Sequence, residues 1–134
     1  MAPALLGVGD GGGDVSITVT GLRSAKGQVL GCLTALPKGF PDCRKDPGAR
    51  KLAVPASPGV VLDFGRVPQG RYAVSLLHDE NGNGKADMAL LFPKEGFGFS
   101  RDAPVRFGPP RFERAAFDVA AGEVRQTVRI RYMF

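Results

Sequence analysis

The chain of 134 residues carries a formal charge of +5 and contains two cysteines and one histidine, and its length suits one domain with its own buried core. Its 19 glycines and 11 prolines exceed average usage, which argues against long helices or a coiled coil, and its apolar runs are far shorter than the roughly 20 residues that span a bilayer. The basic residues are spread along the chain without interleaved aromatics, which argues against a nucleic-acid platform and indicates solvated loop and sheet faces.

The first segment, residues 1–14, has the composition of a flexible lead-in because glycine dominates residues 9–13. It has no basic region and only a brief apolar run, so it lacks the pattern of an intact secretory signal. We interpret it as the start of a mature chain with an added Met1, followed by a single domain over residues 15–134.

Residues 15–20, VSITVT, alternate apolar and polar side chains, which predicts a strand with one buried face. A turn segment separates them from residues 28–35, QVLGCLTA, which we expect to be the hairpin partner, with a bulge at Gly31. Residues 37–50 have the composition of a loop.

Later segments also have strand character. An edge strand stopped by proline is predicted at 51–56, and alternation returns at 60–64. Residues 71–78, RYAVSLLH, are the strongest candidate for a central strand because they are apolar, short and bounded by a glycine and an acidic loop. Residues 115–119 and 124–134 are expected to end the chain as strands.

About seven short strands separated by turns, with no helical period, predict an all-β protein. We expect a single antiparallel β-sandwich with an immunoglobulin-like or prealbumin-like arrangement. The phenylalanine-rich connection at 96–112 is expected to be a long irregular loop that is either functional or packed down by its own side chains.

The two cysteines, Cys32 and Cys43, enclose a loop that contains proline and glycine. Two interpretations are open. One is a disulfide, which needs a suitable geometry and an oxidising compartment; the other is a buried strand thiol at Cys32 with a separate loop thiol at Cys43. A pair this far apart without a nearby histidine is a poor zinc site.

The segment HDENGNGKAD at 78–87 holds the densest set of potential ligand atoms in the chain. Alternating oxygen donors followed by a glycine match the first nine positions of a calcium loop, in which such donors converge on one ion. The predicted ligands are the side chains of Asp79, Asn81, Asn83 and Asp87 and the main-chain carbonyl of Lys85.

Position twelve of that pattern is Leu90 rather than a glutamate, so another group has to complete the shell. Glu95 is the nearest later carboxylate, and Glu80 is less suitable because its side chain should point away from those of its neighbours. With two certain carboxylates we expect weak Ca²⁺ binding, on the order of 10⁻⁴–10⁻³ M. The alternative is that N-G-N-G forms only a turn, with the aspartates bonded to nearby amides. The spacing favours the cation site.

His78 is the single histidine, and in a strand its neighbour Asp79 would point to the opposite face and could not orient it as a base. The chain contains no nucleophile elbow, P-loop or zinc-ligand spacing. We therefore expect a protein that is not an enzyme, with His78 in a packing or capping role. A hydrolase that uses His78 and Asp79 is the outside alternative.

The sequence contains a series of distinctive blocks: GRYAV at 70–74, HDENGNGKAD at 78–87, PKEGFGFS at 93–100, FGPP at 107–110, then Phe112, Ala115 and Phe117. In this order and spacing they resemble a bacterial family catalogued as domain of unknown function 2141, over most of the chain from Val15 onward. Members often have Gly-Ile where this chain has Leu91 and Phe92. The block at 68–72 is also similar, more weakly, to prealbumin-like and collagen-adhesin B-type sandwich domains.

The resemblance implies a small exported protein in the periplasm or outside the cell, and it strengthens the disulfide interpretation, but it implies no activity. Two hypotheses follow. The first is an exported sandwich that binds Ca²⁺ at the acidic loop. The second is a metal-free module that contacts a protein, glycan or envelope component through an aromatic loop, with Phe97, Phe99, Phe107 and Phe112 as its anchors. General hydrophobic arguments favour burial of these rings.

Overall fold

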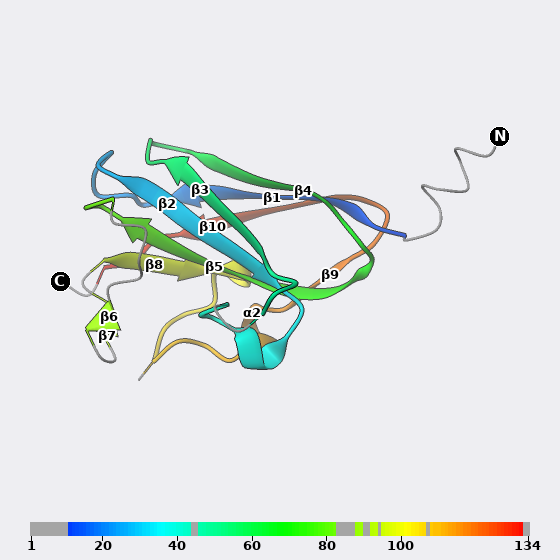
Figure 1. Cartoon of the computed structure of the whole chain (residues 1–134). Coiled ribbons are helices and arrows are strands. Elements are labelled where there is room, and N and C mark those ends of the chain that lie inside the picture. The colour runs from blue at the N-terminus through cyan, green and yellow to red at the C-terminus, as the bar shows by residue number, and fades with distance from the viewer. Residues whose placement is uncertain are drawn as a thin grey trace.

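The computed structural model describes residues 11–43, 46–82, 88–89, 92–93, 95–106 and 108–132. Two β-sheets stack face to face, with short loops and helical turns around them (Figure 1). Among the described residues, no helix is long and apolar enough to cross a membrane. The two stacked sheets confirm the predicted all-β sandwich.

The first sheet has three strands in the order β10-β1-β4. Their bounds are Gly13–Thr20 for β1, Val61–Val67 for β4 and Gly122–Arg129 for β10. β1 pairs antiparallel with β4 and parallel with β10. Side chains of β1 alternate between the interior and the outer face, which is the period-two pattern of its sequence.

The second sheet has the order β3-β2-β5-β8, and β9 also pairs with β5. Its pairings are all antiparallel. The bounds are Gln28–Thr34 for β2, Arg50–Pro55 for β3, Gly70–Asp79 for β5, Gly96–Phe99 for β8 and Phe117–Val119 for β9. A separate two-stranded pair joins β6, Met88–Ala89, to β7, Phe92–Pro93. β5 is central, as its sequence predicts.

Three short helical elements accompany the strands: the 3₁₀ turns η1, Pro37–Gly39, and η2, Ser100–Asp102, and the one-turn helix α2, Phe112–Ala115. The expectation of a wholly irregular segment at 96–112 is therefore wrong, because β8 and η2 lie within it. The final strand is also shorter than expected. It ends at Arg129, and Arg131 then forms an isolated bridge with Phe97 of β8.

The two sheets contain eight strands in total, close to the expected number. Two expectations about strand pairing are wrong. β1 and β2 do not form a hairpin, because each belongs to a different sheet. The sandwich is also not fully antiparallel, since β1 and β10 run in the same direction. A strand with one apolar face can form its backbone hydrogen bonds with a strand that is distant in sequence as well as with a neighbouring one. Alternation of apolar and polar residues therefore does not determine which strand it pairs with.

The main core lies between the sheets. It is built from inward-facing aliphatic side chains, including Ile17 of β1, Leu62 of β4 and Leu76 of β5. Gly31 of β2 faces the same space, and a Cβ atom there would lie 2.4 Å from Leu62 Cδ2. Gly31 is thus a close-packing position rather than the predicted bulge, since β2 pairs with both neighbours in unbroken register.

A second apolar cluster covers the other face of the second sheet. Its aromatic members are Phe97 and Phe99 of β8 and Phe112 of α2, and Phe40 packs against them. Segments 36–43 and 100–116 form this covering and are called the loop layer below. Figure 1 shows α2 below the sheet that contains β5.

Contacts from several sides fix the loop layer to the second sheet. A disulfide joins Cys32 of β2 to Cys43, so of the two interpretations of the cysteines the structure contains the bonded one. Ser75 Oγ donates a hydrogen bond of 2.8 Å to the Pro41 carbonyl. The Val74 N–H donates to Ser100 Oγ, and that hydroxyl donates to the Ala115 carbonyl.

Candidate functional site

The acidic segment begins at the end of the central strand. Asp79 is the last residue of β5, and the backbone turns directly after it, where the Gly82 N–H donates to the Asp79 carbonyl over 3.2 Å. Gly82 has a φ of +66°, a conformation that glycine adopts without steric cost. Of the predicted ligands, Asn83, Lys85 and Asp87 lie outside the described residues, whereas Asp79, Asn81 and Glu95 lie within them.

Asp79 and Glu95 each adjoin the last ladder pair of β5 and β8, His78 and Gly96, at one end of the second sheet. β5 and β8 are antiparallel with His78 opposite Gly96, and Asp79 and Glu95 are the next residues beyond that pair along each segment. Both are buried, with 0% and 5% of their surface exposed. The fold therefore brings together two carboxylates that are 16 positions apart in the sequence.

The buried carboxylate of Asp79 accepts a hydrogen bond from the side chain of Gln28, with Nε2 3.0 Å from Oδ2. Gln28 is the first residue of β2 and lies directly opposite Asp79. Polar side chains of β2 and β5 are therefore paired at this end of the sheet.

Glu80 is held away from that pair. Arg23 donates to Glu80 Oε1 through Nε over 3.1 Å and through Nη2 over 2.6 Å, and Ser24 Oγ donates to Oε2 over 2.7 Å. These hydrogen bonds from Arg23 and Ser24 lower the pKa of Glu80 to about 2. The poor suitability of Glu80 as a ligand, inferred from strand alternation, agrees with this arrangement, because its oxygens are engaged elsewhere.

His78 is fully buried at the same strand end and makes two hydrogen bonds. Nε2 lies 2.8 Å from the Lys26 carbonyl, to which it donates, and Nδ1 lies 2.7 Å from the Tyr132 hydroxyl, from which it accepts. The Tyr132 hydroxyl accepts in turn from the Arg23 backbone N–H over 3.0 Å. Both ring nitrogens are therefore used in packing the strand end.

Tyr132 connects the two strands that carry the acidic pair. Its ring lies against Gly96, where a Cβ atom would be 2.3 Å from Tyr132 Cε2, and Arg23 stacks over the ring with Cζ 4.4 Å from its centroid. Burial raises the pKa of Tyr132, which keeps the hydroxyl protonated as a donor to His78. The contacts of Tyr132 hold the ends of β5 and β8 in one arrangement.

Three of the four predicted aromatic anchors lie within the described residues, and all three are buried. Phe97, Phe99 and Phe112 are 7%, 4% and 6% exposed, and their rings pack within the loop layer and the second sheet. Phe40 lies edge-on to Phe99 and Phe112, with centroids 5.6 and 6.1 Å away. Phe107 lies outside the described residues. The three described rings thus support the loop layer instead of presenting a surface.

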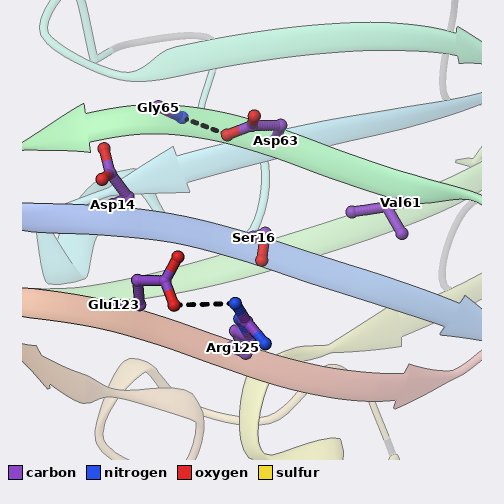
Figure 2. A pocket seen from close by; sticks show the side chains of 7 residues that line it. All are labelled: Asp14, Ser16, Val61, Asp63, Gly65, Glu123 and Arg125. Carbon is purple, nitrogen blue, oxygen red and sulfur yellow. Dashed lines mark hydrogen bonds and ion pairs between the residues drawn. The ribbon is translucent and has the colours of Figure 1, made fainter.

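A shallow hollow of about 450 Å³ lies on the outer face of the first sheet (Figure 2). Its polar side chains, drawn in Figure 2, come from all three strands: Asp14, Ser16, Asp63, Glu123 and Arg125. Arg125 pairs with Glu123 over 2.7 Å, and Asp63 accepts from the Gly65 N–H. Its charged groups are exposed and partly satisfied by one another, so the hollow has the character of a solvated sheet face.

Within the described ranges, no group of three or more His, Cys, Asp or Glu side chains is placed to hold a metal ion. The acidic pair supplies two carboxylates, and the remaining predicted ligands come from the part of the loop outside those ranges. Sequence reasoning missed Gln28, Arg23 and Tyr132 as neighbours of this site. Their positions carry no local signal, because each comes from a segment distant in sequence.

The comparisons with known proteins identify a family model and no individual relative. The model described as "Uncharacterized protein conserved in bacteria (DUF2141)" matches residues 17–127. No curated protein and no solved structure matches the chain. The matched range includes all strands of both sheets except the ends of β1 and β10.

Proposed function

The chain belongs to the family of uncharacterized bacterial proteins DUF2141, and from this membership we propose that it is an exported, non-enzymatic β-sandwich protein that binds Ca²⁺ through the loop at 79–87. Glu95 completes the ligand shell in this proposal. The observation that carries it is the placement of two buried carboxylates, Asp79 and Glu95, next to the last paired residues of β5 and β8.

Carboxylate oxygens are among the ligands that Ca²⁺ prefers. Asp79 and Glu95 bring such oxygens to one end of the sheet from two segments of the chain. In this proposal Glu95 takes the role of the glutamate that is absent at position twelve, since it comes from a later segment that reaches the same end of the sheet.

Calcium suits the ligand types better than other common metals. The proposed ligands are carboxylate, amide and carbonyl oxygens, and no cysteine or histidine belongs to the set, which favours a hard cation over zinc. Amide ligands from asparagine add no charge, so we expect a dissociation constant on the order of 10⁻⁴–10⁻³ M, in the range of extracellular modules.

The disulfide between Cys32 and Cys43 supports export, because such bonds persist in oxidising compartments and are rare in the cytosol. A location outside the cytoplasm also suits weak calcium binding, since sites of that affinity occur in extracellular modules. The proposed location is the periplasm or the cell exterior.

The setting of His78 supports a non-enzymatic role. A general base needs access to its substrate, but His78 is fully buried and both ring nitrogens bond to groups of the fold itself. The alternative of an aromatic binding loop receives less support, because Phe97, Phe99 and Phe112 are buried. We therefore retain the calcium proposal alone.

A calcium titration followed by thermal melting tests the proposal. At 10 mM Ca²⁺ and the expected affinities, binding adds about 1.4–2.7 kcal/mol to the free energy of unfolding, which corresponds to roughly 4–10 °C in Tm. Glu95→Gln should abolish most of this shift. The matched control is Glu113→Gln, since Glu113 is an exposed glutamate of α2. A wild-type Tm that does not respond to millimolar Ca²⁺ would refute the proposal.

A further inference from the structure

The loop layer carries a group of exposed cations. They are Lys38 of η1, Arg101 of η2, Arg114 of α2, and Arg106 and Arg111 between η2 and α2. None of the five forms an ion pair with a residue in the described part of the chain. The carboxylates on the surface of this layer are fewer. Asp42 and Glu113 are exposed, whereas Asp102 is engaged by Arg131.

The three short helical elements bring these cations to one side of the molecule. α2 packs against both η1 and η2, and Phe40, just after η1, contacts Phe112 of α2. Figure 1 shows this region as one covering on the second sheet, opposite the first sheet. Cations that look scattered in the sequence, from residue 38 to residue 114, are therefore gathered by the fold.

Some of the cations on the sandwich form ion pairs. Arg23 pairs with Glu80, Arg71 with Asp118 and Arg125 with Glu123. Exposed cations that form no ion pair with a described residue also occur on the sandwich, at Lys26, Arg50 and Lys51. The loop layer differs because two short segments hold five cations against three carboxylates, Asp42, Asp102 and Glu113, and this excess would attract an anionic partner.

The same surface also presents an exposed aliphatic side chain. Among the described residues only Leu36 and Val61 are large apolar residues with high exposure, each at 48%. Leu36 directly precedes η1 and its Lys38, whereas Val61 lies on the outer face of the first sheet. At a membrane interface an apolar side chain beside cations adds apolar burial to the electrostatic attraction.

We propose that the loop layer docks onto an anionic lipid surface, with its arginines against the lipid phosphates and Leu36 in the headgroup region. Charge complementarity and the combination of basic and aliphatic groups favour this partner. A single-stranded nucleic acid would need exposed aromatic rings for its bases, but Phe97, Phe99 and Phe112 are buried. This surface is distinct from the acidic pair and does not depend on calcium.

Each arginine close to an anionic leaflet strengthens binding about fivefold, so Arg111→Gln combined with Arg114→Gln should weaken vesicle binding about 25-fold. Leu36→Ser should weaken it about fivefold, from loss of half-exposed aliphatic area. Binding should also fall steeply with added salt, because exposed charges are screened.

The test is co-sedimentation of the full chain with vesicles of phosphatidylcholine containing about one-third phosphatidylglycerol, and with vesicles of phosphatidylcholine alone. A chelator is present throughout to remove calcium. Arg71→Gln combined with Arg125→Gln makes the same change in net charge on the sandwich, and Val61→Ser makes the same kind of apolar change. Both controls should bind as the wild type does, within about threefold. Thermal melts confirm that every variant is folded.

Three results would overturn the proposal. One is wild-type protein that does not sediment with anionic vesicles at low salt. Another is an equal loss in the sandwich control, which would show that net charge alone governs binding. The last is binding to heparin or polyphosphate without binding to vesicles, which would identify a soluble polyanion as the partner.

Discussion

Removing the disulfide should destabilise the domain without unfolding it. Cys32 and Cys43 are separated by 11 positions, and opening a loop of that size returns entropy to the unfolded chain worth about 3 kcal/mol at 25 °C. The folded loop keeps its other anchors, which are the hydrogen bond from Ser75 to the Pro41 carbonyl and the packing of Phe40. We therefore expect the free energy of unfolding of Cys32→Ala combined with Cys43→Ala to fall by about 3 kcal/mol.

Urea denaturation followed by circular dichroism measures this change, with the wild type as reference and with reductant added to each protein. Reductant should have no effect on the double variant. In the wild type, both cysteines are buried, so reduction should require prolonged incubation. A loss of less than about 1 kcal/mol in the free energy of unfolding would refute the loop-closure reasoning. A double variant without a cooperative transition would show that the anchors at Pro41 and Phe40 are insufficient to keep the domain folded.

Three further outcomes follow from the strand end and the core. The folded pKa of Glu80 is lowered to about 2, so its ion pair with Arg23 contributes stability that is present above about pH 4.5 and lost as pH falls toward 2. In Glu80→Gln, the free energy of unfolding should therefore depend less on pH within that window. Tyr132→Phe leaves buried His78 Nδ1 without its donor and should cost about 1–3 kcal/mol in urea denaturation. Gly31→Ala places a Cβ atom in the packed core and should cost about 1–3 kcal/mol, whereas an unchanged midpoint would contradict that close packing.

The strands themselves could be predicted from the sequence because their signal is local. Alternation at residues 15–20 and 60–64 and the apolar run at 71–78 correspond to β1, β4 and β5. Glycine and proline marked the boundaries between them. The pairing of β1 with β10 could not be predicted in this way, since more than 100 residues separate the two strands and the same alternation fits several partners.

The candidate site was predictable in part for the same reason. Donor spacing identified Asp79 and Asn81 as possible ligands, and the missing twelfth ligand led to Glu95. The pairing of β5 with β8, a tertiary feature, is what brings Glu95 to the end of the sheet where Asp79 lies. The hydrogen bonds that link Arg23 to Tyr132 and Tyr132 to His78 likewise join segments more than 50 residues apart, so no local sequence pattern predicts them.

The central claim is that Asp79 and Glu95 together hold a calcium ion, and a crystal structure grown with millimolar Ca²⁺ tests it most directly. We predict density for an ion with oxygens of both carboxylates within about 2.3–2.6 Å. The predicted oxygens of the loop between them should complete the shell. Carboxylates that remain as a pair with no ion between them, and bond only to groups of the protein such as Gln28, would contradict the account.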